Sequence, residues 1–225
     1  MSLVETFFNY DVFSRSLPLL LSGLVTTIEL GVVAIIFGSV LGLIICLTRL
    51  YAAKPLRYAA IIYIDVMRAL PTLVVLIVIY YALPFVGVRL SAFVSASIAL
   101  CLVLAAYTAE VFRSGIEAVP KGQFEAAQAL GLRFRTTLRL VVVPQALRIV
   151  IPPTTSNFIA VIKDTSLASI VAMPDLLKQA MDAQAYNANP TPLLGAALIY
   201  LVVLWPMVRF VGFLERRAQT DRKAG

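Results

Sequence analysis

The chain alternates between long apolar runs and shorter polar connections, and this alternation predicts a helical membrane protein. Five runs reach the roughly 20 apolar residues that a helix needs to cross a bilayer. Their apolar positions are continuous rather than alternating, so spanning β-strands are a poor fit. We therefore expect an all-α integral membrane protein whose five transmembrane helices cover residues 17–47, 58–84, 92–111, 149–173 and 191–214.

Small residues form a ridge along the first predicted span, at Ala34, Gly38 and Gly42. Such residues let two helices approach closely. The ridge therefore predicts close packing, either inside this subunit, which we favour, or against another subunit. The residues before the span include Glu5 and Asp11. An acidic start is untypical of a cleaved secretion signal, so the first span is expected to stay in the membrane.

Prolines are expected to shape three other spans. Pro71 should bend the second span, because proline disrupts the helix around it and frees a backbone carbonyl. Pro152 and Pro153 suit the first turn of the fourth span, where missing backbone donors cost little. Pro206 should kink the fifth span.

The connection of residues 121–144 is charged and carries a short-helix pattern. A helix is predicted between Gly122 and Leu130, and Gly131 is expected to end it as a left-handed cap. Phe134 to Val143 can form a second helix. This loop is suited to contact by a soluble partner. The alternative is an ordinary amphipathic helix at the membrane surface.

Composition supports the membrane class and excludes others. Of the 225 residues, 60% are hydrophobic and 14% are charged, with a mean hydropathy of +0.91. A soluble domain of this size cannot bury so much apolar surface. The chain has no histidine and no paired-cysteine motif, which excludes a His–Cys metal site. Cys46 and Cys101 lie in apolar runs as small hydrophobes. We expect residues 1–225 to form one transmembrane domain.

Positive charge is distributed unevenly among the connections and predicts the orientation. Lys and Arg collect in cytoplasmic loops of membrane proteins, so the net charge of +7 does not imply a nucleic-acid partner. One side has only Arg15, Arg89 and Lys178. We therefore expect the N-terminus outside, and the C-terminus and the 121–144 loop in the cytoplasm. The cation-rich side holds Arg49, Lys54, Arg57, Lys121, Arg133, Arg135, Arg139, Arg148, Arg216, Arg217, Arg222 and Lys223.

Lys163 and Asp164 interrupt the fourth apolar run. A charge at the bilayer centre costs about 2.5–3.5 kcal/mol on insertion scales, so both residues need protein, water or a ligand beside them. Thr165 and Ser166 extend the polar patch, and Asn157 lies two turns earlier on nearly the same helix face as Asp164. The pattern predicts a ligand site at mid-depth in the membrane.

The alternative for this patch is an interhelical ion pair, with Arg68 or Glu29 as the partner. Two further pairs of charges are three residues apart near the ends of the second and third spans. Residues at that spacing are neighbours on a helix, so Asp65 is expected to pair with Arg68 and Glu110 with Arg113.

A spaced motif in the 121–144 loop resembles a known family. It reads Glu125-Ala126-Ala127, three residues, Gly131, nine residues, Val141, one residue, Val143 and Pro144. This closely resembles the cytoplasmic Glu-Ala-Ala loop in membrane subunits of ATP-binding-cassette importers, with Val143 replacing the usual Leu. Similarity to polar amino acid permeases extends over most of the chain, at Gly23-Leu24, Thr27, Gly38, Gly42, Arg68, Pro71 and Lys163-Asp164-Thr165-Ser166-Leu167.

The resemblance implies a MetI-like, type I importer fold in the bacterial cytoplasmic (inner) membrane, in contact with lipid. Implied partners are a second permease subunit, which is the same or a related chain, two cytoplasmic ATPase subunits and an external amino-acid-binding protein. The sequence lacks the Gly-x-x-x-x-Gly-Lys-Ser/Thr motif of nucleotide-binding chains. ATP and Mg²⁺ are therefore expected on the partner ATPase, with no catalytic site, cofactor or metal on this chain.

The resemblance also implies which residues act. One departure is that the second span reads Ala69-Leu70-Pro71-Thr72-Leu73-Val74-Val75 after Arg68, where the subfamily usually has Gly-Thr-Pro-Leu-Leu-Val-Gln. Thr72 can substitute for the lost hydrogen-bonding groups. The implied substrate contacts are Asn157, Asp164 and Thr165, then Arg68 and Lys163, with Ser166 and Thr72. The implied ATPase-coupling residues are Phe124, Glu125, Ala126, Ala127, Leu130 and Gly131.

The function expected from this reading is inward movement of a polar amino acid, driven by a separate ATPase through the Glu-Ala-Ala loop. Asp164 would suit an amino or cationic group, and Arg68 would suit a carboxylate. One alternative is an ion-coupled secondary transporter that works through Asp164, Lys163 and Glu29. Another is a membrane scaffold without a solute path. An embedded enzyme is disfavoured, because no nucleophile–base pair or metal cluster is evident.

Overall fold

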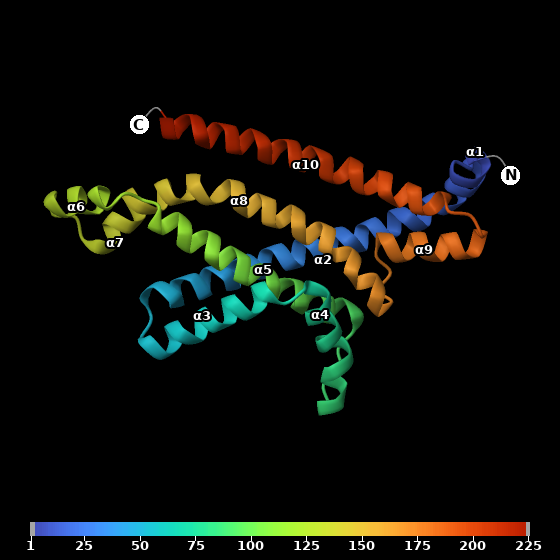
Figure 1. Cartoon of the computed structure of the whole chain (residues 1–225), viewed down its shortest axis with the longest axis horizontal. Coiled ribbons are helices and arrows are strands. Elements are labelled where there is room, and N and C mark those ends of the chain that lie inside the picture. The colour runs from blue at the N-terminus through green and yellow to red at the C-terminus, as the bar shows by residue number, and fades with distance from the viewer. Residues whose placement is uncertain (1–2, 224–225) are drawn as a thin grey trace.

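The computed structural model describes the backbone of residues 3–223 and the side chains of residues 5–216. Over that range the chain is helical and has no strand, which confirms the expected all-α class. The long helices run roughly along the longest axis (Figure 1). The helices are α1 (Leu3–Phe7), α2 (Tyr10–Tyr51), α3 (Lys54–Ala69), α4 (Thr72–Ile77), α5 (Ala92–Glu117), α6 (Lys121–Ala129), α7 (Phe134–Thr137), α8 (Val143–Asp164), α9 (Leu176–Asn187) and α10 (Thr191–Lys223).

Helix α2 contains the first predicted span and extends beyond it at both ends. Asn9 starts it, because its side-chain oxygen accepts a hydrogen bond from the backbone N–H of Val12. The small-residue ridge faces α5: a Cβ added to Gly38 would lie 3.0 Å from a Leu104 methyl carbon, and one added to Gly42 would lie 2.9 Å from the Ala105 carbonyl oxygen. The ridge therefore packs inside the subunit, as we favoured.

The second predicted span is a broken helix. Helices α3 and α4–η2 meet at an angle of 105°, and the chain between them is extended at Leu70 and Pro71. The predicted bend at Pro71 is confirmed. Beyond α4, the π-helical turn η1 (Val78–Ala82) and the 3₁₀ turn η2 (Leu83–Val86) lead to Gly87, whose φ of 85° ends the span.

The fourth predicted span begins earlier than expected. Residues 134–142 form α7 and the π-helical turn η3 (Leu138–Val142), and α8 continues directly from them. Pro152 and Pro153 therefore lie inside α8, so their predicted place in its first turn is wrong. Prolines inside transmembrane helices are tolerated where neighbouring helices and side chains satisfy the freed backbone groups. Here α8 packs along α5, and Pro152 is buried.

Asp164 is the last residue of α8, and the chain then tightens into the 3₁₀ turn η4 (Thr165–Val171). The charged pair of the fourth span therefore lies at a change of helix type rather than within one regular helix. Discontinuous helices of this kind surround the mid-membrane sites of many transporters.

Helix α9 lies between the fourth and fifth predicted spans and ends in a tight turn. Ala188, with a φ of 45°, ends the helix. The start of α9 is docked against α2: the backbone N–H of Leu176 donates to the Thr27 hydroxyl oxygen at 3.0 Å, and a Cβ on Gly23 would lie 2.8 Å from the Asp175 carbonyl oxygen. Gly23 therefore has to be a glycine for α9 to lie this close.

Asp175 caps α9 from a fully buried position, just beyond the fourth predicted span. Its carboxylate accepts hydrogen bonds from the backbone N–H groups of Lys178 at 3.0 Å and Leu177 at 3.4 Å. Burial raises the pKa of Asp175 to about 6, against the opposing effect of these donors and of the Lys178 charge.

Replacing Asp175 by Asn should remove a pH dependence of stability. The folded pKa lies above the ordinary aspartate value, so only the folded state holds this proton between about pH 4 and pH 6. The free energy of unfolding should therefore fall as pH rises through this window, by at most about 3 kcal/mol. Asn also caps helices, so the neutral variant keeps α9.

Thermal unfolding in detergent across this pH range checks the expectation. Asp182→Asn is the matched control, since Asp182 is exposed on the same helix and pairs with Lys178. An Asp175→Asn variant with the same pH slope as the wild type would contradict the assignment.

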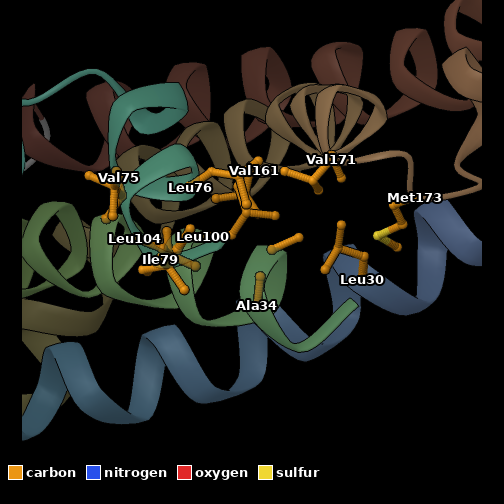
Figure 2. Packing of buried hydrophobic residues seen from close by; sticks show 14 residues of the cluster. Leu30, Ala34, Val75, Leu76, Ile79, Leu100, Leu104, Val161, Val171 and Met173 are labelled. Carbon is orange, nitrogen blue, oxygen red and sulfur yellow. The ribbon is translucent and has the colours of Figure 1, made fainter. Parts of the chain in front are cut away.

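The largest apolar core lies where α2, α4, α5 and α8 meet (Figure 2). Leu30 and Ala34 come from α2, Val75 and Leu76 from α4, and Val161 from α8. Because residues of α4 and α8 belong to this core, it fixes the start of α4 and the end of α8 relative to each other.

Length and composition identify three single helices that could cross a membrane within the described residues. They cover Glu5–Tyr51, Ala92–Glu117 and Thr191–Arg216, and the bent pair Lys54–Ala69 with Thr72–Val86 gives up to four. The chain thus has several apolar helices, as a multi-pass membrane protein requires. Of the cations that predicted the orientation, Arg217, Arg222 and Lys223 have side chains outside the described residues.

Candidate functional site

Two helix discontinuities that are far apart in the sequence meet inside the helical body. Thr72 is the first residue of α4, and Asp164 is the last residue of α8. The Thr72 hydroxyl donates a hydrogen bond to Oδ2 of Asp164 at 3.0 Å. The structure therefore brings together two of the predicted substrate contacts.

Asp164 has no ion pair within the described residues. It is half-buried, and its Oδ1 atom makes no hydrogen bond and is not enclosed. Arg68, the cation that could pair with Asp164, instead has its guanidinium 5.7 Å from the ring centre of Tyr107. Glu29, which could pair only with Lys163, is exposed on α2 and forms no ion pair among the described residues. The interhelical ion pair is therefore wrong, and the carboxylate is open to a cationic group.

The other polar residues around Asp164 face different surroundings. Thr165 is fully buried, donates to the Ile162 carbonyl at 2.7 Å and packs towards Gly31. Ser166 donates to the carbonyl of Lys163 at 2.7 Å. In this structure both hydroxyls therefore complete the backbone hydrogen bonding of the helix end, while Asp164 keeps one oxygen open.

Asn157 has a side-chain nitrogen that is buried without a hydrogen-bond partner. An unpaired buried donor costs about 1–3 kcal/mol. Asn157 lies two turns before Asp164 on α8, so an unpaired donor and an open acceptor sit along one helix.

Lys163 belongs to an exposed stripe on α8 and has no ion pair or side-chain hydrogen bond within residues 5–216. The stripe also contains Pro153, Ser156 and Ala160, which follow one another at helical spacing. A lysine in a span is too costly to face lipid alone. This face of α8 therefore requires water or another chain against it.

A cluster of ion pairs joins the ends of α2 and α5 that lead to the polar loops. Arg49 donates to Glu110 at 2.7 Å, and Arg113 pairs with both Glu110 and Glu117. The predicted Glu110–Arg113 pair is confirmed, but Asp65 does not pair with Arg68 within the described residues. The Arg49–Glu110 ion pair was not predicted, because no spacing in the sequence indicates which residues of α2 and α5 are neighbours.

Helix α6 and Gly131 form the short-helix loop in the way that the spacing predicted. Gly131 has a φ of 73°, and the backbone N–H of Leu132 donates to the Ala127 carbonyl at 3.0 Å, as a left-handed helix cap requires. Glu125, Ala126 and Gly131 are exposed. Leu130, which follows the last residue of α6, is 80% exposed.

The inner side of this loop is anchored on two long helices. Ala127 is buried, and Phe124 packs with Val119, which follows the end of α5, with Val142 of η3 and with Ala146 of α8. Phe134 of α7 makes an edge-to-face contact with Tyr51 at the end of α2, with ring centres 6.3 Å apart. No sequence signal predicted this second anchor.

The loop with α6 and α7 lies at the opposite end of the molecule from helix α9. Figure 1 shows α6 and α7 at one end of the long axis and α1 and α9 at the other, with α4 between the two ends. The Thr72–Asp164 hydrogen bond joins α4 to the end of α8. A push on the loop would therefore act on the helices that carry the contact.

Comparisons with known proteins agree with this arrangement. The family described as binding-protein-dependent transport system inner membrane component matches residues 38–220. The L-cystine transport system permease protein TcyB of Bacillus subtilis is 38% identical over 211 residues, which are 92% of this chain and 90% of that protein. The probable amino-acid ABC transporter permease protein YckA of the same organism is 36% identical over 95% of both chains.

A solved structure also resembles this chain in both sequence and fold. A crystal structure of an amino acid ABC transporter with histidines contains a chain that is 34% identical to this one. The two chains superpose with a TM-score of 0.87, over 93% of this chain and 98% of the other.

Proposed function

The chain belongs to the family of binding-protein-dependent transport system inner membrane components, and on that premise we propose that it is the permease subunit of an ATP-driven importer for polar amino acids. The observation that carries the proposal is the exposed Glu125-to-Gly131 loop, anchored on α5 and α8 at one end of an apolar helical body. The two relatives from Bacillus subtilis are named for cystine and amino-acid transport, which supports the substrate class.

The proposed topology has five spans, with the N-terminus outside and the C-terminus in the cytoplasm. The bent pair α3–α4 makes the second span, and α8 with η4 makes the fourth. The distribution of Lys and Arg supports this orientation. It puts α6 in the cytoplasm and α9 outside, in the bacterial cytoplasmic (inner) membrane that the family description supports.

The proposed assembly contains a second permease subunit, two cytoplasmic ATPase subunits and an external amino-acid-binding protein. The exposed α8 stripe with Lys163 supports the second permease, because water or a neighbouring chain has to cover it. ATP and Mg²⁺ bind the ATPase subunits in this proposal. The chain itself is a non-enzymatic membrane component.

The proposed substrate site is centred on Asp164. Its open oxygen suits the amino group of a substrate, and Asn157 offers a free donor on the same helix. Lys163 can face the substrate carboxylate from the exposed stripe. Arg68, stacked on Tyr107, stands apart from Asp164 in this conformation. A carboxylate without a cationic partner favours cationic and zwitterionic amino acids over anionic ones.

The proposed coupling is mechanical. Closure of the ATPase dimer moves the α6 loop, and its anchors transmit this movement to α5, α8 and α2. These helices hold the breaks at Thr72 and Asp164, so the site can open on one side and close on the other.

Isolation of the intact complex tests the proposal. The chain should be purified in mild detergent, identified together with any bound ATPase, and assayed for ATP hydrolysis with a panel of amino acids. We expect an ATPase to co-purify and at least one polar amino acid to stimulate it. Uptake in ATP-free vesicles under an ion gradient would instead favour a secondary transporter. The absence of any uptake would favour a scaffold.

A further inference from the structure

The hydrogen bond between Thr72 and Asp164 restrains only half of the carboxylate. Thr72 donates to Oδ2 at 3.0 Å, while Oδ1 stays unbonded and accessible. A carboxylate on a short side chain turns about its last two bonds, and a single donor on one oxygen fixes the direction in which the other oxygen points.

The donor is itself held in place. Thr72 begins α4 directly after the extended residues Leu70 and Pro71. Val75 and Leu76, on the next turn, lie in the largest apolar core. The β-branched side chain of Thr72 has few rotamers. The start of α4, held by this packing, therefore presents a hydroxyl to the last residue of α8.

We propose that Thr72 is a positioning residue for substrate recognition: its hydroxyl holds the Asp164 carboxylate so that Oδ1 faces the substrate's cationic amino group. The inference rests on the proposed function and adds a specificity determinant to it. A Leu usually occupies the Thr72 position in the subfamily pattern and has no hydroxyl to offer.

The test is a double-mutant cycle on the purified complex, with L-arginine, L-lysine and L-glutamine as probes. Thr72→Val keeps the shape of the side chain and removes the donor, whereas Thr72→Ser keeps the donor. We expect Thr72→Val to raise the half-maximal amino acid concentration for ATPase stimulation about tenfold, the effect of losing one hydrogen bond to a charged group. The maximal rate should stay within about twofold, and Thr72→Ser should restore the wild-type value.

The cycle is closed in the Asp164→Ala background, where no carboxylate remains to be positioned. Thr72→Val should then have no further effect on the half-maximal concentration. An equal effect in both backgrounds would mean that Thr72 acts through packing, and would overturn the inference. A lower half-maximal concentration in Thr72→Val would also overturn it, because Thr72 would then compete with the substrate for Asp164.

Failure of this inference differs from failure of the proposed function. If the wild-type complex responds to no amino acid, the proposed function is wrong. If the wild type responds and Asp164→Ala weakens the response, but Thr72→Val behaves like the wild type, only the role of Thr72 is overturned.

Discussion

Gly131→Val is expected to uncouple ATP hydrolysis from amino acid uptake while leaving the protein folded in the membrane. Gly131 has a φ of 73°, a conformation that costs an ordinary L-residue roughly 1–2 kcal/mol and that is rarer still for a β-branched one. Relief of this strain would unwind the cap at Leu132 and move Leu130, the exposed apolar residue of the loop.

The effect should appear in the ratio of uptake to hydrolysis. Couplings between distant sites amount to about 1–3 kcal/mol, so a lost contact should reduce amino acids transported per ATP by about tenfold or more. Uptake and hydrolysis are measured together in vesicles that contain the complete complex. Unchanged uptake per ATP in Gly131→Val would contradict the coupling role of the loop.

Two control variants separate coupling from strain. Gly131→Asn should remain coupled, because asparagine tolerates the left-handed conformation. Gly87→Val creates the same strain elsewhere: Gly87 has a φ of 85° and, like Gly131, has open space where a Cβ would lie. Because Gly87 follows α4–η2 rather than the α6 loop, its variant should keep the wild-type ratio.

Several elements were predictable because a short-range pattern controls them. The Gly131 cap and the Pro71 bend each depend on one residue whose backbone preference decides the local conformation. The Ala34, Gly38 and Gly42 ridge is visible as a spacing of four. In these places the local preference and the packed structure agree.

Other features depend on contacts between distant segments and were not predictable. Pro152 and Pro153 are typical of a helix start, but they lie inside α8, a helix that packs along α5. The sequence indicated that Asp164 is exceptional, yet not that Thr72, 92 residues away, would be its donor. The contact between Tyr51 and Phe134 was also not predictable, because neither segment carries a sequence signal that points to the other.

Asp164→Asn is expected to weaken the response to cationic and zwitterionic amino acids without destabilising the protein. A hydrogen bond to a charged group contributes about 1.5–3 kcal/mol, so the half-maximal substrate concentration should rise about tenfold to a hundredfold. The protein should unfold at the same or a higher temperature. The reason is that the variant removes a half-buried charge that has no ion pair, while the Asn oxygen can still accept from Thr72.

The half-maximal substrate concentration and the melting temperature together show whether Asp164 binds the substrate or serves as a structural charge. If Asp164 were a structural ion-pair partner, its neutralisation would lower the melting temperature and leave substrate dependence unchanged, because breaking a buried pair is strongly destabilising. Asp65→Asn is the matched control, since Asp65 is exposed on α3 and has no ion pair within the described residues. If Asp164 instead binds the substrate, Asp164→Asn should lower the affinity for the amino acid and leave the melting temperature unchanged or higher, since a charge kept for binding often costs stability.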